Sequence, residues 1–200
     1  MTRHHALAAG AVLAAVLAAL VAGPAAAHTG QGGLAGLTTG FLHPITGLDH
    51  VVAMVAVGLW GGILGRPAIW MLPVIFPLAM AVAGAAAIAG VPLAGVETGI
   101  ALSGIVLGLM VLFALRPPLW VAGLIVGVFA VFHGHAHGAE LPAATSPALY
   151  AAGFVIATGM LHLSGIAIGY LWRWRSGQVA VRAAGGAIAV AGAAFLTGLA

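Results

Sequence analysis

Long apolar stretches alternate along the chain with short breaks that contain glycine, proline or arginine. A helix of about 20 apolar residues crosses the hydrocarbon core of a bilayer. We therefore predict six transmembrane helices, at residues 49–64, 68–89, 93–115, 119–137, 147–172 and 179–199. The breaks between them hold residues that end helices, such as the Gly-Arg-Pro run at 65–67. The predicted fold class is an all-α membrane protein, a bundle of six transmembrane helices.

The first 27 residues have the three parts of a secretory signal peptide. A short basic start is followed by an apolar run at 6–23 and by the small residues Pro-Ala-Ala-Ala at 24–27. We expect cleavage after residue 27, which leaves residues 28–200 as one transmembrane domain; an uncleaved first helix is the alternative. The amine and imidazole of His28 would then chelate a divalent metal together, or His28 is simply a solvated end residue.

Composition excludes several classes of protein. Hydrophobic residues make up 63% of the chain and charged residues 4%, whereas soluble domains carry about 25% charged residues. The absence of cysteine excludes disulfides, iron–sulfur clusters and thiolate zinc sites. The six Lys and Arg residues form no basic stripe, so nucleic acid is not an expected partner. Nine histidines outnumber both the basic residues and the three acids, and this excess needs an explanation.

The charges favour one orientation of the six helices. If residue 28 lies outside, the loops after the first, third and fifth helices lie inside. These loops and the start of the last helix hold every arginine after residue 27: Arg66, Arg116, Arg173, Arg175 and Arg182. Membrane proteins carry their basic residues on the cytoplasmic side. The same map places the three acids at the outer ends of helices and both ends of the mature chain outside.

Glycine spacing indicates close packing of the helices. Gly104 and Gly108 lie four residues apart in the third predicted helix, and Gly165 and Gly169 do so in the fifth. Small residues at this spacing allow helix backbones to approach each other in lipid. We expect a compact bundle.

The first polar motif precedes and enters the first predicted helix. Pro44 and Gly47 favour a turn, with Asp49 near the helix N-cap and His50 in the first turn. Such a turn folds His43 back toward the other two side chains, which gives two imidazoles and a carboxylate for one divalent ion. The alternative is that Asp49 only caps the helix and His43 lies at the surface.

The second polar motif ends the fourth predicted helix. His133, His137 and Glu140 lie at positions i, i+4 and i+7, on one helical face, whereas His135 points to the opposite side unless the glycines break the helix. Histidines at i and i+4 with a carboxylate one turn on are a recurring set of metal ligands. Three histidines within five positions therefore indicate metal binding or ion transfer.

Two further ionisable residues belong to predicted helices, where such groups are costly unless paired or wetted. Glu97 begins the third helix and His162 lies inside the fifth. His162 either lines an inner path or is a neutral histidine bonded to a backbone carbonyl. Phe76, between two prolines of the second helix, is expected to be a packed aromatic. Because the orientation places both motifs and Glu97 on the outer side, we predict that they converge in one site.

The two motifs resemble the signatures of the HupE/UreJ family of nickel/cobalt permeases. His43, Asp49 and His50 match a His-x5-Asp-His signature, and residues 132–140 match the FHGxAHGxE signature. The signal peptide, the mature start His-Thr-Gly, the six helices and residues 51–60 are also similar. The resemblance implies uptake of Ni(II), or alternatively Co(II), from the periplasm across the bacterial inner membrane for maturation of a hydrogenase or urease. The metal would be the transported substrate, with no permanently bound cofactor.

If the protein is a permease, the expected depth of each candidate residue suggests its role. The ion would be captured by His43, His135 and the His28 terminus, and the inner path would hold Glu97 and His162. Coordination would fall to Asp49, His50, His133, His137 and Glu140. No ATP-binding motif is present, so a gradient, a partner or trapping of the metal would supply the energy. The alternatives are an intramembrane zinc hydrolase and a metal sensor or buffer; whether the chain forms a homo-oligomer stays open.

Overall fold

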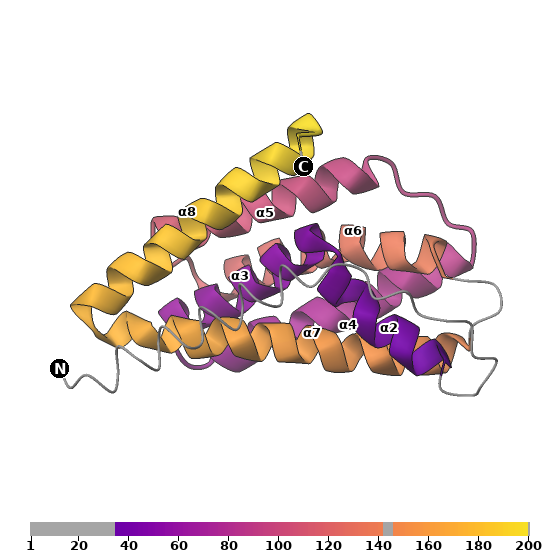
Figure 1. Ribbon diagram of the computed structural model, residues 1–200, viewed down its shortest axis with the longest axis horizontal. Coiled ribbons are helices and arrows are strands. Elements are labelled where there is room, and N and C mark those ends of the chain that lie inside the picture. The colour runs from indigo at the N-terminus through magenta and orange to yellow at the C-terminus, as the bar shows by residue number, and fades with distance from the viewer. Residues whose placement is uncertain (1–34, 142–145, 200) are drawn as a thin grey trace. The chain divides into compact units, whose positions relative to one another are not determined.

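A computed structural model of the chain describes residues 35–141 and 146–199 (Figure 1). The described part is helical and contains no strand. Its elements are α2 (Ala35–Thr46), α3 (Leu48–Leu64), α4 (Ala68–Ile88), α5 (Val96–Leu112), α6 (Leu119–Ala139), α7 (Pro147–Gly169), the 3-10 helix η1 (Tyr170–Arg173) and α8 (Arg175–Thr197). The predicted signal peptide and His28 lie outside the described residues.

Helices α3 to α8 occupy the positions of the six predicted helices, with shifted ends. Four spans are long and apolar enough to cross a membrane: α4, α6, α7 with η1, and α8. A fifth is obtained if α2 and α3, bent by 79° at their junction, count as one broken span. Helix α5 has 17 residues, which is about 26 Å and shorter than the predicted range 93–115. The all-helical class is thus confirmed, while six complete crossings stay a prediction.

Helix α2 was not predicted, because its pattern of small and polar residues lacks the apolar run of the later helices. Pro44 was expected in a turn but lies inside the last turn of α2. The chain leaves helical geometry only at Gly47, whose backbone is extended (φ −84°, ψ 106°) and which precedes α3 as its N-cap. Asp49 lies in the first turn of α3, and its Oδ1 accepts a 2.9 Å hydrogen bond from the backbone N–H of His50, one of the amides that a helix N-terminus leaves unpaired.

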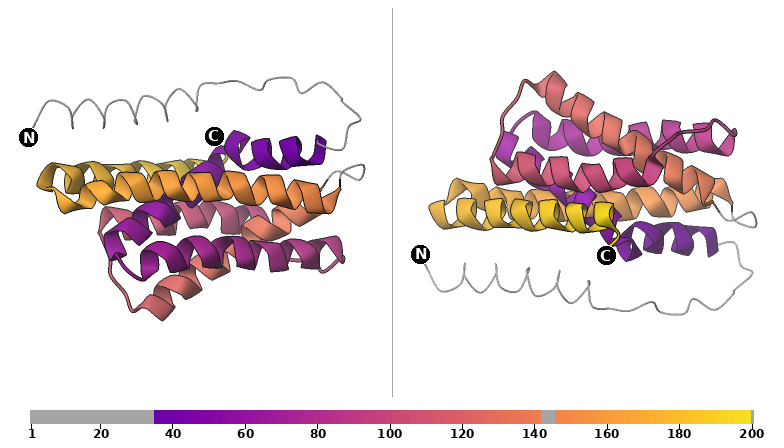
Figure 2. Two further views of the ribbon diagram at one scale, coloured as in Figure 1. Left: turned by 90° about the horizontal axis from the view of Figure 1, so that it is seen from below. Right: turned by 90° about the horizontal axis from the view of Figure 1, so that it is seen from above.

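The expected glycine contacts are present. Helices α5 and α8 lie side by side (Figures 1 and 2), and a Cβ on Gly108 would come within 2.5 Å of the backbone nitrogen of Ala189. Helices α3 and α7 touch in the same way, since a Cβ on Gly165 would lie 3.0 Å from the Cα of Gly58. Helices α4 and α6 form a third such pair. These contacts leave no room for side chains between the paired backbones.

Helix α3 lies at the centre of the bundle. It contacts α2, α4, α5, α7 and α8, and its side chains from Met54 to Trp60 are almost all buried. The indole nitrogen of Trp60 donates a hydrogen bond of 2.9 Å to the carbonyl of Leu115, just beyond α5. Arg182 of α8 donates another, of 2.8 Å, to Leu112 at the end of α5. Side chains thus satisfy carbonyls that a helix terminus leaves unpaired.

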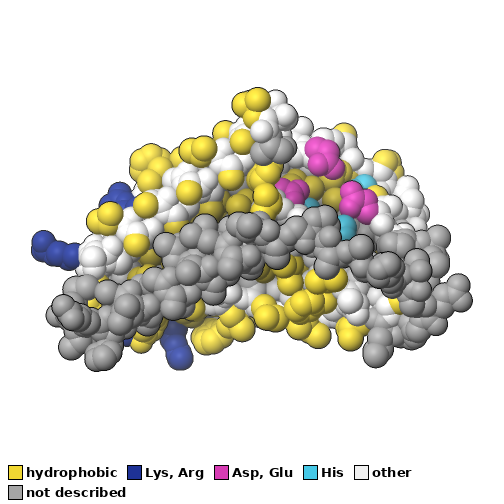
Figure 3. Space-filling view, viewed as in Figure 1, with side chains coloured by type: hydrophobic (Ala, Val, Ile, Leu, Met, Phe, Trp, Pro, Cys, Tyr) yellow, Lys and Arg dark blue, Asp and Glu magenta, His cyan; other side chains and the backbone are white. Residues whose placement is uncertain are grey.

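Charged side chains are segregated along the bundle. In the space-filling view, the Arg side chains lie at one end and the acidic and His side chains gather toward the other (Figure 3). We call these the arginine end and the acidic end. This separation agrees with the predicted map of the loops. It does not by itself say which end faces the cytoplasm.

Candidate functional site

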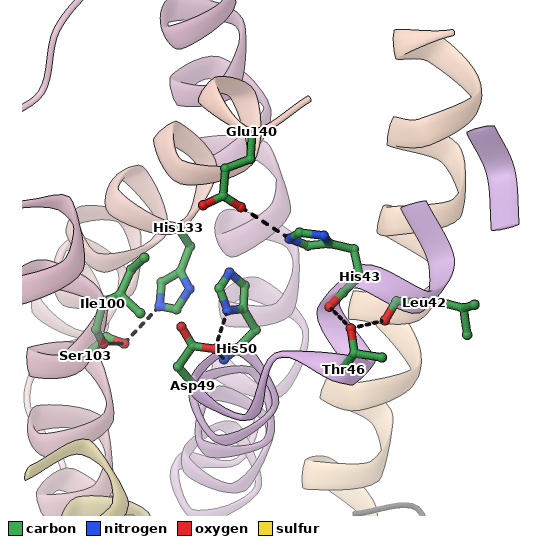
Figure 4. A network of polar contacts seen from close by, with 9 residues as sticks. All are labelled: Leu42, His43, Thr46, Asp49, His50, Ile100, Ser103, His133 and Glu140. Atoms are coloured by element: carbon green, nitrogen blue, oxygen red, sulfur yellow. Dashed lines mark hydrogen bonds and ion pairs between the residues drawn. The ribbon is translucent and has the colours of Figure 1, made fainter. Parts of the chain in front are cut away.

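The bend between α2 and α3 brings the first motif together at the acidic end. His50 lies in the first turn of α3, and its ring nitrogen Nδ1 is 2.7 Å from Oδ1 of Asp49 (Figure 4). An ionised carboxylate only accepts hydrogen bonds, so Nδ1 carries the proton. The lone pair of His50 is then on Nε2, which is buried and has no hydrogen-bond partner among the described residues.

Ser103 fixes the second histidine in a similar way. Its hydroxyl donates a 2.6 Å hydrogen bond to the carbonyl of Ile100, and its Oγ lies 2.9 Å from Nε2 of His133. Because the one hydroxyl hydrogen is already donated, Ser103 accepts from Nε2 and the lone pair of His133 is on Nδ1. That atom is buried without a partner in the described part of the chain. Ser103 was not predicted as a site residue, because a serine in an apolar helix has no distinguishing pattern.

Four imidazoles form one group, which we call the histidine cluster: His43, His50, His133 and His137. The ring centroid of His50 lies 4.4 Å from that of His137 and 4.9 Å from that of His133. His43, from α2, lies 4.8 Å from His137. Neither ring nitrogen of His137 has a partner within residues 35–141 and 146–199. The predicted return of His43 toward His50 is therefore confirmed, and the two motifs do converge.

A cavity of about 280 Å³ opens beside this cluster. It is lined by His43, Thr46, Gly47, Asp49, His50, Glu97, Ile100, Ala136 and Glu140. All three acids of the chain thus line one cavity, and clustered charge of one sign raises the local concentration of cations. Oε2 of Glu140 lies 3.8 Å from Nε2 of His43. Glu97 lies with the two motifs at this cavity, as predicted from the orientation, and it is exposed at the acidic end and not on an inner path.

The cluster is not a finished metal site. No three His, Asp or Glu side chains of the described residues are arranged so that they could hold one metal ion. Ligating nitrogens lie about 2.1 Å from a metal such as zinc, so neighbouring rings must rotate before they share an ion. The donor atoms thus lie near one another, but they do not surround one position for a metal ion.

Two predicted residues lie away from the cavity. His135 lies on another face of α6, with Nε2 at 2.8 Å from the carbonyl of Val91 in the loop before α5. His162 is 1% exposed inside α7, and its ring lies 5.4 Å from that of Phe76. Neither nitrogen of His162 has a partner in the described ranges, so the alternative of a histidine bonded to a backbone carbonyl is wrong.

Tyr150 is a further neighbour of the histidine cluster that was not predicted. Its ring centroid lies 6.1 Å from that of His43, and its hydroxyl is buried without a partner among the described residues. The same residue lines an apolar groove of about 360 Å³ between α4, α6 and α7, to which His137 also contributes. One side of the cluster is therefore apolar and the other is acidic.

A bundle of apolar helices that gathers its acids and four histidines at one end is an integral membrane protein with a polar site at that end. Residues 14–195 match the family model described as HupE / UreJ protein. Protein HupE of Rhizobium leguminosarum bv. viciae is 49% identical over 175 residues, which cover 86% of this chain and 90% of that relative. The chain belongs to the HupE/UreJ family. No solved structure matches it.

Membership of the HupE/UreJ family confirms the resemblance that the two motifs indicated, and it defines the protein as a transporter. Proteins of the HupE/UreJ family are permeases, generally for nickel or cobalt, and are associated with hydrogenase and urease. The chain is therefore a transporter and not an enzyme, and the intramembrane zinc hydrolase is set aside.

Proposed function

We propose that this protein imports Ni(II), with Co(II) as the alternative metal, from the acidic end of the bundle to the arginine end. The observation that carries the proposal is the histidine cluster, with its unpartnered nitrogens, beside a cavity lined by all three acids. Neutral imidazole and carboxylate together suit borderline divalent metals. A permease must also release its ion, which favours mobile donors over a closed cage.

The proposed roles follow the position of each side chain. Glu97, Glu140 and His43 attract and capture the cation at the cavity. His50, His133 and His137 coordinate it in transit, each through a buried nitrogen that has no partner among the described residues. Asp49 holds the ring of His50 in one tautomer, as carboxylates do for metal-ligating histidines. His135 is held at the loop and is left out of the ligand set, and His28 keeps its proposed role in capture.

The proposed orientation uses the positive-inside rule. The arginine end then faces the cytoplasm and the acidic end faces the periplasm of a bacterial inner membrane. The bent pair α2–α3 and the short helix α5 complete six crossings after the signal peptide is removed. The imported metal would serve the maturation of a metalloenzyme such as hydrogenase or urease.

The test is metal entry into proteoliposomes that contain a metal-sensitive dye, with Ni(II), Co(II) and Zn(II) compared. We expect saturable entry for the wild type and a loss of at least tenfold for Asp49→Ala. Ser164→Ala is the matched control, because the hydroxyl of the half-buried Ser164 donates its hydrogen bond, of 2.9 Å, to the Met160 carbonyl of its own helix.

Two outcomes would contradict the proposal. Unchanged entry in the Asp49 variant would remove the first motif from the pathway. Metal binding to the purified wild type without any entry would instead favour the sensor or buffer alternative.

A further inference from the structure

A second polar position lies deeper in the bundle. Thr158 and His162 are one turn apart on α7 and are 0% and 1% exposed. The hydroxyl of Thr158 and both ring nitrogens of His162 have no hydrogen-bond partner among the described residues. A buried polar atom left unpaired costs about 1–3 kcal/mol, and such atoms require an explanation.

This position is separate from the histidine cluster. His162 comes 15 residues after Pro147, about 22 Å along α7 from its acidic end. His133 comes six residues before Ala139, only about 9 Å along α6 from the same end. His162 therefore lies nearer the arginine end than His133 does.

One aromatic ring connects the two levels. The ring centroid of Phe76 lies 5.6 Å from that of His133 and 5.4 Å from that of His162. Phe76 is fully buried, between Pro73 and Pro77 of α4. His133 of the histidine cluster, on α6, and the deeper His162, on α7, thus both lie against the ring of Phe76.

The α3 side of this position is closed. A Cβ on Gly58 would overlap the carbonyl of His162 and lie 2.8 Å from the nitrogen of Ile166. No side chain of α3 separates the two backbones there. An ion that reaches His162 would therefore arrive from the side of Phe76 and α4.

We propose that His162 and Thr158 form an inner binding station that receives the divalent cation after it leaves the histidine cluster. This inference rests on the proposed transport function. An imidazole nitrogen and a hydroxyl oxygen are acceptable donors for a borderline divalent metal, and two donors hold it weakly enough for release. Polar groups at this depth of a membrane protein mark ion pathways.

The experiment compares binding with flux. His162→Phe keeps a ring of similar size against Phe76 but removes both nitrogens, and Thr158→Val removes only the hydroxyl. Binding of Ni(II) to the purified protein is measured by titration calorimetry, and entry is measured in proteoliposomes. Ser164→Ala, on the same helix, is again the control.

We expect both variants to bind Ni(II) within twofold of the wild type, because the cluster is intact. Entry should fall at least tenfold in His162→Phe and several-fold in Thr158→Val. If His162→Phe does not fold, the valine variant, which keeps the side-chain shape, decides the question.

Unchanged Ni(II) entry in the variants that fold would overturn the inner station. Thr158 and His162 would then be a structural pair that hydrogen-bonds to a buried water. Loss of binding together with entry would also overturn it, because the residues would then belong to the outer site. Absence of entry in the wild type would refute the transport proposal itself, and the inner station with it.

Discussion

Ser103 provides the sharpest test of how the site is organised. Ser103→Ala removes the oxygen that accepts the proton of His133 Nε2 and leaves the residues that line the cavity unchanged. Both partners are 0% exposed, so no bulk water replaces the lost hydrogen bond. The ring of His133 is then free to move its proton to Nδ1, the atom whose lone pair faces the cluster.

The expected size of the effect follows from general measurements. A buried N–H without a partner costs about 1–3 kcal/mol, and the loss of a residue that orients a metal ligand typically lowers metal affinity by about 10–100-fold. We expect Ser103→Ala to weaken Ni(II) binding within that range. Ser164→Ala should stay within twofold, because the Ser164 hydroxyl donates to the Met160 carbonyl of its own helix and not to a histidine ring.

Two measurements separate this orienting role from a general loss of packing. Titration calorimetry gives the affinity for Ni(II), and ¹⁵N chemical shifts of His133 report which ring nitrogen carries the proton. We expect a proton on Nε2 in the wild type and a mixture of tautomers in the variant. A variant that binds Ni(II) as the wild type does, with the proton of His133 still on Nε2, would refute the reasoning.

Two further predictions address the cavity and the packing. Glu140→Gln removes one of the three charges around the cavity, so Ni(II) entry at low concentration should fall about threefold and depend less on salt; equal salt dependence in initial rates would argue against it. Gly58→Ala would place a Cβ 2.8 Å from the nitrogen of Ile166 and should lower the free energy of unfolding by about 1–3 kcal/mol. Thermal unfolding in detergent checks this against Gly159→Ala, where nothing lies within 4 Å of the added carbon; equal melting of the two variants would contradict it.

The convergence of the two motifs was predictable because it depends on helix direction more than on detailed packing. Arginines mark one set of loops, and the acidic and His residues then fall at the opposite end. The 3.6-residue period placed His133 and His137 on one face, as observed. Six helix positions were also predictable, since long apolar runs with proline and arginine breaks are strong patterns.

Other features depended on contacts that no local pattern encodes. Glu97 was expected with the two motifs on the outer side and was also given a role on an inner path; the first place holds and the second does not, because α5 begins at Val96 and leaves this side chain at the cavity. Ser103 is recognisable only once α5 lies against α6. Helix α2 escaped prediction because it gains its burial from α7, where Gly40 packs against the backbone of Tyr150.

The central position of α3 has a consequence for how the protein is made. Apart from α2, the described helices that pack around α3 are all synthesised after it. Until those helices are inserted, the apolar face of α3 contacts lipid. Lipid tails are as apolar as the protein interior, so Met54 and Leu59 are equally well accommodated in both. Trp60 is different, because the carbonyl that accepts its N–H lies 55 residues further along the chain. The indole must wait for the segment that follows α5, so this hydrogen bond forms when the bundle assembles and not when α3 is inserted.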